Sequence, residues 1–260
     1  IMGVLNITPD SFSDGGKYIL KETAVKKFSE LLSAGSDVID IGGQSTRPGS
    51  KYVGYQEEIN RVLPVLIELR KSYPKAIISI DTFLSKVALK LLENGADWVN
   101  DVSGGREDQD MLRVVAEASC PYIITHSRGN SQTMYKYCQY KNVTKEVIEE
   151  LIILTENAIS MGVKSSQIIW DPGIGFAKTN DQNIQIIREL DTFKSFGFPV
   201  LIGPSRKKFL GYILDESDPE KRLPGTLSVA CKCVSSGISM IRVHDVHDVF
   251  RAIKVANHLF

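Results

Sequence analysis

Short apolar runs rich in β-branched residues alternate with longer amphipathic stretches along the whole chain. This alternation predicts repeated βα units around a parallel sheet. Eight runs are short and apolar, as strands buried on both faces are, and they cover residues 1–7, 37–43, 76–81, 97–101, 121–126, 167–171, 198–203 and 238–244. The stretches between them carry apolar residues at helical spacing, as Val62, Val65, Leu66 and Leu69 do after the second run.

Glycines recur at the ends of four predicted helices, where a left-handed residue can end a helix before the next strand. They are Gly35, Gly95, Gly162 and Gly237, and each interval between them holds two βα units. Units of this size over 260 residues predict one α/β domain, 1–260, folded as a (β/α)8 TIM barrel of eight parallel strands with outer helices. A doubly wound open sheet is the alternative, but no predicted strand is followed by a G-x-G-x-x-G turn.

Composition and charge exclude several classes of protein. Hydrophobic residues make up 43% and charged residues 24%, as in ordinary globular chains, and Lys plus Arg equal Asp plus Glu at 31 each. This balance provides no bulk positive field for nucleic acid or an anionic membrane, so any anion site must be local. No apolar run approaches the ~20 residues of a membrane helix, and no basic signal-peptide region precedes Lys17. We expect an intracellular protein, cytoplasmic or, in a eukaryote, mitochondrial, with its four cysteines reduced.

Polar and charged residues follow all eight predicted strands. Because a barrel of this type has its active site at the carboxyl ends of its strands, we expect these residues to form one ring. In strand order the ring holds Asn6; Thr46 and Arg47; Asp81; Asn100 and Asp101; His126; Asp171; Ser205 and Lys207; and Arg242 and His244. Each alone can be explained as a helix cap or a turn residue, and His126 is more simply a hydrogen-bonded histidine than a catalytic one.

The ring as a whole indicates a ligand with both signs of charge. Caps and turns do not require Arg47, Lys207 and Arg242 to share a rim with Asp81 and Asp171. Carboxylates accept hydrogen bonds from a nitrogen-rich ring, whereas Arg, Lys, His and Asn hold a phosphate-like group or a leaving oxyanion. A planar heterocycle that bears an anion fits this demand.

Two loops after the first two strands are long, polar and rich in glycine. They read TPDSFSDGG from Thr8 and GGQSTRPGSKYVG from Gly42. Loops of this length in a compact barrel are usually lids or binding loops, and plain solvated connectors are the alternative.

Seven segments together resemble the dihydropteroate synthase family, and they extend over nearly the whole chain. The segments are MGVLNITPDSFSDGG, DIGGQSTRPGS, SIDTF, VNDVSGG, DPGIGFAKT, PSRKKFLG and IRVHD. The resemblance implies a transferase of folate synthesis that joins 6-hydroxymethyl-7,8-dihydropterin pyrophosphate to para-aminobenzoate. The products would be 7,8-dihydropteroate and pyrophosphate, and sulfonamides would compete with the aniline.

The resemblance also implies roles for the ring residues at the pterin. Asp171 would accept hydrogen bonds from the pterin N3–H and 2-amino group, with Asp81 and Asn100 completing recognition of the heterocycle. Lys207 would reach the pterin carbonyl, and Arg242 would lie over the pterin face. We expect the catalytic residues to be Lys207, Asp81, Asp171 and Arg242, and Asp101 and Ser205 to be further substrate-binding residues.

The resemblance implies separate places for the pyrophosphate and for para-aminobenzoate. Asn6, Arg242 and His244 would hold the departing pyrophosphate together with Mg²⁺, for which Asn6 is the predicted protein ligand. Para-aminobenzoate would lie near Thr46, Arg47, Pro48, Phe176 and Lys207. Ordering of Asp14 and Arg47 over the bound pterin would exclude water.

Two positions depart from common bacterial members of the family. Gln44 stands where a Glu is frequent, and Lys208 follows Lys207 where a Ser often binds the benzoate carboxylate. The chain begins at Ile1, inside the first predicted strand, so we expect a domain excised from a longer polypeptide. In fungi and plants the family domain follows a hydroxymethyldihydropterin pyrophosphokinase domain, and such a fusion, together with a homodimer, is what the resemblance implies.

Three other functions are alternatives. A methyltetrahydrofolate-type methyltransferase shares a pterin-binding barrel, but it does not need a pyrophosphate clamp such as Lys207, Arg242 and His244. A Schiff-base aldolase would use Lys207, which lies between Arg206 and Lys208 with no apolar pocket evident in the sequence. The third is a non-catalytic pterin-binding paralogue that acts as an assembly partner.

Overall fold

The structure is a computed structural model that describes residues 1–8, 17–45 and 49–260. Eight strands follow the predicted runs: β1 (Met2–Asn6), β2 (Val38–Gly42), β3 (Ile77–Asp81), β4 (Trp98–Asp101), β5 (Tyr122–Thr125), β6 (Ile168–Asp171), β7 (Leu201–Ile202) and β8 (Met240–Val243). They pair in parallel in the order β6-β5-β4-β3-β2-β1-β8-β7. A parallel bridge from Trp170 to Val200 joins β6 to the residues before β7, which closes the ring.

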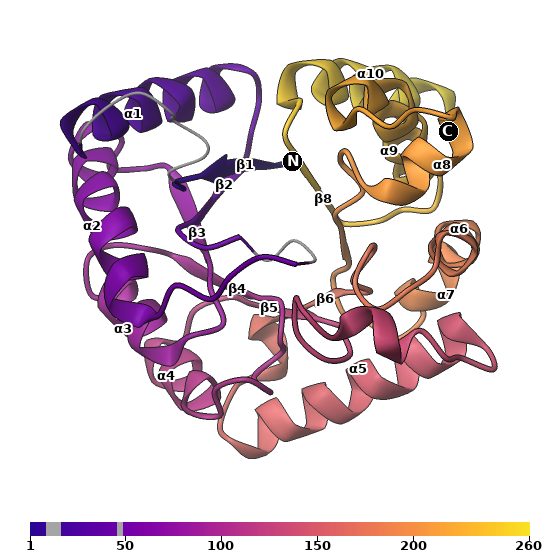
Figure 1. Ribbon diagram of the computed structural model, residues 1–260, viewed down its shortest axis with the longest axis horizontal. Helices are drawn as coiled ribbons and strands as arrows, with labels where there is room; N and C mark the ends of the chain where they lie inside the picture. Colours follow the sequence, from indigo (N-terminus) through magenta and orange to yellow (C-terminus); the bar gives the residue numbers. More distant parts are fainter. Residues whose placement is uncertain (9–16, 46–48) are drawn as a thin grey trace.

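The helices of the described chain lie outside this ring (Figure 1). They are α1 (Lys17–Ser33), α2 (Tyr55–Ser72), α3 (Ser85–Leu92), α4 (Asp110–Ala118), α5 (Val143–Ser160), α6 (Asn180–Arg188), α7 (Leu190–Lys194), α8 (Lys208–Leu214), α9 (Leu223–Ser235) and α10 (Val246–Leu259). Short 3-10 turns cover Met134–Tyr137, Ser165–Gln167 and Pro219–Arg222. The predicted (β/α)8 barrel is confirmed, and the open doubly wound sheet is excluded.

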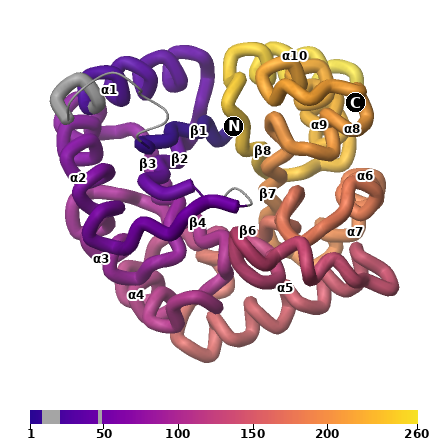
Figure 2. The backbone as a smooth tube through the Cα atoms, viewed as in Figure 1, coloured from indigo at the N-terminus to yellow at the C-terminus, as the bar shows by residue number. Residues whose placement is uncertain are grey.

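The chain runs once round the barrel, so its first and last units lie side by side (Figure 2). Met2 and Gly3 of β1 pair with Arg242 and Val243 of β8. The four predicted helix-ending glycines all have positive φ, from 64° at Gly237 to 103° at Gly35, as the left-handed position requires.

The seventh strand is shorter than predicted. The prediction covers 198–203, but only Leu201 and Ile202 form regular strand. Pro199 has no N–H to donate to a ladder, and its carbonyl accepts from the Trp170 N–H instead.

The barrel interior changes from apolar to polar along the strand direction. Its amino end is filled by a separate apolar cluster of Met2, Val38, Ile123, Ile169 and Leu201. Side chains two positions apart on a strand face the same side, so the next inward layer is two residues further on. That layer holds Asp40, Asn100, Thr125, Asp171 and Arg242.

Two expectations about the chain as a whole can be compared with the structure. Within the described residues, no helix is both long and apolar enough to cross a bilayer. The four cysteines are free thiols, as expected, and Cys120 and Cys233 are buried.

Candidate active site

Arg242 joins two carboxylates across the carboxyl end of the barrel. Its Nε donates to Asp40 Oδ2 at 2.7 Å, and its Nη2 donates to Asp81 Oδ2 at 2.7 Å. The Asn100 amide donates to the same Asp40 oxygen at 2.9 Å. Strands β2, β3, β4 and β8 therefore each place one inward side chain in a single polar cluster.

The pKa of Asp81 is raised from 3.8 to about 7, because burial and the Asp40 charge raise it more than Arg242 and Lys207 lower it. The nearby Asp40 and Asp81 raise the pKa of the Arg242 guanidinium against the effect of burial. Asp40 Oδ1 is buried and has no hydrogen-bond partner among the described residues. A buried acceptor of this kind is free to bind a donor on a ligand.

Asp171 ends β6 and brings a further carboxylate to the same end of the barrel. Its Oδ1 accepts from the Gly173 N–H at 2.7 Å, and among the described residues its Oδ2 has only a long contact of 3.5 Å with the Thr125 hydroxyl. Burial raises the pKa of Asp171, and the charges of Lys207, Lys178 and Arg242 lower it. The carboxylate is thus oriented on one side, and its other oxygen is available to a ligand.

Lys207 and Phe176 come together from different loops. The Lys207 Nζ lies 4.2 Å from the centre of the Phe176 ring, a cation–π contact. Lys207 also acts at a distance on the pKa of both Asp81 and Asp171, which places it beside the carboxylate cluster. An aromatic wall with a cation next to it suits a flat anionic ligand.

Ser205 and His244, after β7 and β8, form one pair. The Ser205 hydroxyl lies 2.9 Å from His244 Nδ1 and accepts from the His244 N–H at 3.2 Å. The next residue of each loop repeats the link, because Arg206 donates to both oxygens of Asp245, at 3.1 and 2.6 Å. The loops after β7 and β8 are thereby fixed to each other beside Arg242.

The amino-acid sequence of this chain is similar to those of known pterin-binding enzymes. A family described as pterin binding enzyme matches residues 2–244. A dihydropteroate synthase of Synechocystis is 44% identical over 260 residues, and the match covers 100% of this chain and 90% of the relative. The chain belongs to the dihydropteroate synthase family of pterin-binding enzymes.

Two further relatives of this family differ in length. A folate synthesis bifunctional protein of Arabidopsis thaliana is 43% identical, and the match covers 99% of this chain but 56% of the relative. A dihydropteroate synthase of Clostridium difficile, solved in the presence of pteroic acid, has a TM-score of 0.93 and 37% identity, with 100% of this chain and 95% of that chain covered.

Most of the predicted ring of this family member meets at one end of the barrel. Asp81, Asn100 and Arg242 share one cluster with Asp40. Lys207 contacts Phe176, Ser205 contacts His244, and Asp171 ends β6 at the same end of the barrel. Asn6 ends β1 and pairs with Gly42 of β2. Asp14, Thr46, Arg47 and Pro48 lie outside the described residues.

Asp101 is one of two predicted ring residues, with His126, whose side chains are buried in hydrogen bonds to other parts of the protein. Its oxygens accept from the N–H groups of Ser103 and Gly105 and from the hydroxyls of Ser103 and Tyr122, at 2.7 to 2.8 Å. Asp101 is fully buried and builds its own loop, so its predicted substrate contact stays a prediction.

A cavity of about 330 Å³ lies among the loops that follow β2 to β6, and its described lining includes Phe176 but none of Asp40, Asp81, Asp171 and Arg242. Phe176 forms one wall, and Gln44, Phe83, Val102 and Ser127 are among its other lining residues. The second long loop reaches this cavity from Gly49, whose N–H donates to the Ser131 carbonyl at 2.8 Å. The described part of that loop therefore borders this cavity, and its role as a binding loop stays a prediction.

The sequence reasoning missed two residues of this region. Asp40 lies inside the apolar run VIDIG, and a carboxylate at an inward position of a buried strand was the signal that could have revealed it. Lys178, in DPGIGFAKT, is buried and contacts His126, and no local pattern distinguishes it from a surface lysine. His126 is a buried hydrogen-bonded histidine, in agreement with the simpler of its two interpretations.

Proposed function

We propose that this protein condenses 6-hydroxymethyl-7,8-dihydropterin pyrophosphate with para-aminobenzoate, giving 7,8-dihydropteroate and pyrophosphate for folate biosynthesis. The observation that carries the proposal is the cluster in which Arg242 bridges Asp40 and Asp81 at the end of the barrel where Asp171 also lies. Family membership of the whole chain supports the same reaction.

The carboxylates suit the pterin ring. Its N3–H and 2-amino group are donors, and Asp171 presents an oxygen that the protein leaves weakly bonded at 3.5 Å. Asp40 presents a second buried acceptor without a partner among the described residues. Asn100 completes recognition of the heterocycle, and Lys207 donates to the pterin carbonyl.

The same groups favour cleavage of the bond to the leaving group. When the carbon–oxygen bond breaks, the electron pair leaves with pyrophosphate, and the pterin methylene carbon becomes part of a delocalised cation. Fixed carboxylates stabilise this charge as it develops, which lowers the barrier more than it strengthens ground-state binding. The aniline nitrogen then attacks that carbon and releases a proton.

The departing pyrophosphate needs cations and hydrogen-bond donors near the carboxylate cluster. Arg242 and the Ser205–His244 pair are positioned by the fixed loops after β7 and β8. Asn6 adds an amide at the end of β1.

Mg²⁺ fits this site as a partner of the pyrophosphate. Among the described residues, no group of three or more His, Cys, Asp or Glu side chains could hold a metal ion. Mg²⁺ commonly keeps several waters and binds substrate phosphates with one or two protein ligands, so the Asn6 amide oxygen is a sufficient protein contact. When bound, the ion neutralises the charge of the leaving group.

Para-aminobenzoate has its place beside Phe176 and Lys207, with Thr46, Arg47 and Pro48 of the second loop as further proposed contacts. Asp14 and Arg47 are proposed to close over the bound pterin. Lys208 donates to the Tyr135 hydroxyl at 3.0 Å and keeps further N–H donors with which it could bind the benzoate carboxylate. A Yersinia pestis relative is solved with a sulfonamide drug, which supports competition by sulfonamides at this position.

Homodimer formation and fusion to a pyrophosphokinase domain stay predictions. Light scattering of the purified protein tests the first, and the full-length transcript tests the second.

The decisive experiment mixes the protein with Mg²⁺, dihydropterin pyrophosphate and para-aminobenzoate and measures pyrophosphate and 7,8-dihydropteroate. The proposal expects both products at equal rates and no pyrophosphate when the aniline is omitted. Equal release without the aniline would mean hydrolysis, and pterin binding without any release would identify a non-catalytic paralogue. Methyl transfer from methyltetrahydrofolate, or borohydride trapping of a carbonyl substrate on Lys207, would favour the other two enzyme classes.

A further inference from the structure

The loop that follows β6 carries two side chains of the site, and part of its backbone has a left-handed conformation. Asp171 begins this loop and Phe176 lies within it. Gly173, Gly175 and Ala177 all have positive φ, at 71°, 84° and 47°. For Ala177 the left-handed region costs about 1–2 kcal/mol, because its Cβ crowds the following carbonyl. Further contacts of the loop must therefore hold this conformation.

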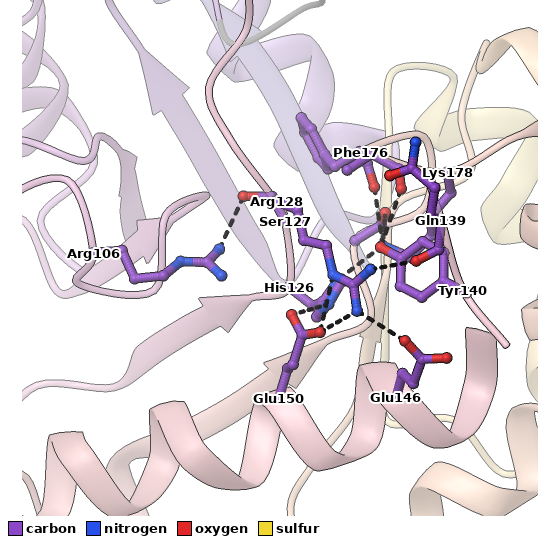
Figure 3. Close-up of polar contacts among 12 residues, drawn as sticks. Arg106, His126, Ser127, Arg128, Gln139, Tyr140, Glu146, Glu150, Phe176 and Lys178 are labelled. Carbon is purple, nitrogen blue, oxygen red and sulfur yellow. Dashed lines mark hydrogen bonds and ion pairs between the residues drawn. The ribbon is translucent and has the colours of Figure 1, made fainter. Parts of the chain in front are cut away.

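Lys178 provides these contacts from within (Figure 3). Its Nζ donates to the Gly173 carbonyl at 3.0 Å, to the Phe176 carbonyl at 3.0 Å and to His126 Nδ1 at 2.9 Å. These acceptors match the three donors of an ammonium group, and Lys178 is only 5% exposed. The side chain thus connects two carbonyls of its own loop to the end of β5.

His126 links Lys178 to an acidic anchor on α5. Lysine donates to Nδ1, so Nε2 carries the hydrogen and donates to Glu150 Oε2 at 3.0 Å. Glu150 in turn accepts from Arg128 Nε at 2.9 Å (Figure 3). Burial, with the Lys178 charge, lowers the pKa of His126 from 6.5 to about 3, so the ring stays neutral.

A second connection returns from Arg128 to the loop. The Arg128 guanidinium lies 3.9 Å from the centre of the Tyr140 ring, and the Tyr140 hydroxyl donates to the Ala177 carbonyl at 3.1 Å. The strained residue is therefore fixed by Tyr140 from one side while the adjacent Lys178 is fixed by His126.

The loop transmits this anchoring to both parts of the site. Gly173 accepts from Lys178 through its carbonyl and donates through its N–H to Asp171 Oδ1 at 2.7 Å. Phe176 accepts from Lys178 through its carbonyl and contacts Lys207 through its ring. A shift of the Lys178 side chain would move the carboxylate and the aromatic wall together.

We infer that Lys178 is a positioning residue that sets the orientation of Asp171 and Phe176 at once, an inference that rests on the proposed function. A buried ammonium is a costly way to stabilise a loop, since burial opposes its charge. Burial lowers the pKa of Lys178 from 10.5 to about 7, although Asp171 and Glu150 raise it. An apolar side chain would avoid this cost but would leave the carbonyls of Gly173 and Phe176 without a donor.

Lys178→Met tests the inference, because it keeps the length of the side chain and removes its donors. We expect kcat/KM to fall about 100-fold for the dihydropterin substrate and for para-aminobenzoate alike, since small misplacements of positioning groups have effects of this size. Rates are expressed per folded enzyme, measured by circular dichroism. Lys145→Met is the matched control, because Lys145 is an exposed lysine on α5, the helix that bears Glu150.

Two more measurements separate positioning from a merely structural role. In ¹⁵N spectra of the imidazoles, the His126 Nδ1 signal should move in Lys178→Met and stay unchanged in the control. Tyr140→Phe removes only the bond to Ala177 and should lower kcat/KM about fivefold, the worth of about 1 kcal/mol. The Tyr140→Phe variant also tests the anchoring of the loop if Lys178→Met does not fold.

The outcomes distinguish this inference from the proposed function. A wild-type protein that forms no dihydropteroate would overturn the function itself. An active wild type with unchanged kcat/KM in folded Lys178→Met, or in Tyr140→Phe should the lysine variant fail to fold, would overturn the positioning role of Lys178. Loss for only one of the two substrates would also contradict it.

Discussion

Arg242 Nη2 on β8 donates to Asp81 Oδ2 on β3 at 2.7 Å, across the open end of the barrel. Arg242 Nε bonds Asp40 in the same way, so one guanidinium stands between two buried carboxylates. Arg242 therefore stabilises the folded barrel, because its positive charge offsets part of the negative charge of the two buried carboxylates.

Removal of the cation should destabilise the barrel in a pH-dependent way. Arg242→Met leaves Asp40 and Asp81 buried without their partner, and breaking buried pairs typically costs about 3–5 kcal/mol. We expect the free energy of unfolding to fall by this amount at pH 8. At pH 5 it should fall less, since Asp81 with its raised pKa can take up a proton. Urea unfolding at both pH values measures it, and equal losses at pH 5 and 8 would argue against the pairing.

Asp171→Asn should weaken pterin binding. An amide that accepts from one ring N–H points its own N–H₂ towards the other donor. Loss of a charged hydrogen bond is worth about 1.5–3 kcal/mol, or about tenfold to 100-fold in affinity. Calorimetry with the pterin substrate measures the change, with the exposed Asp191→Asn as control. Unchanged affinity would remove Asp171 from the site.

Lys207→Ala should lose turnover and keep the fold. Lys207 contacts the Phe176 ring and acts on the buried carboxylates, and it is only half-buried, so its truncation leaves no cavity in the core. We expect kcat to fall by about 100-fold, as for other electrostatic groups of this kind. Thermal unfolding should match that of Lys221→Ala, an exposed lysine. Wild-type rates with para-aminobenzoate would contradict the assignment.

Gly173→Ala tests the close contact between the loop after β6 and the end of β5. A Cβ at Gly173 would lie 1.8 Å from the His126 carbonyl oxygen, so the backbone must move. Gly197 has a similar φ of 80° but open space around its Cβ position. We expect the free energy of unfolding to fall by about 1 kcal/mol in Gly197→Ala and by about 3 kcal/mol or more in Gly173→Ala, as measured by urea unfolding. Similar losses in both variants would show that the contact is loose.

Glu58 should make the barrel less stable as the pH rises. It is fully buried on α2, and burial raises its pKa from 4.5 to about 7. The folded protein therefore binds a proton at Glu58 that the unfolded chain has lost, so stability present below pH 4.5 falls as the pH rises through 7. Each unit of pKa difference is worth ~1.4 kcal/mol, so protonation of Glu58 contributes at most about 3 kcal/mol to the free energy of unfolding.

Glu58→Gln is the variant that isolates this effect. It should flatten the difference in unfolding free energy between pH 5 and 7.5, whereas Glu156→Gln, at an exposed position, should leave the difference unchanged. An identical pH dependence in wild type and Glu58→Gln would show that the Glu58 carboxyl is not protonated by folding.

The amino-acid sequence predicted the fold because its signals are local. Apolar runs, helical spacing and helix-ending glycines such as Gly35 each act within a few residues, and together they gave every strand of the barrel. The predicted ranges exceed the strands by one to four residues, and the difference is largest at β7, where Pro199 has no N–H for the ladder. Strand ends also predicted which polar residues gather at one end of the barrel, since parallel strands bring their carboxyl ends to one edge.

What the chain alone determined is therefore which residues reach the open end of the barrel. Which of them pair was decided by tertiary structure: Arg242 meets Asp40 across 202 positions, and Lys178 meets His126 across 52. Asp101, also at a strand end, is bound by its own loop instead. The reason is physical: a buried charge needs a partner, and the partner comes near only when the ring of strands closes. The residues adjacent in sequence do not indicate which distant group that will be.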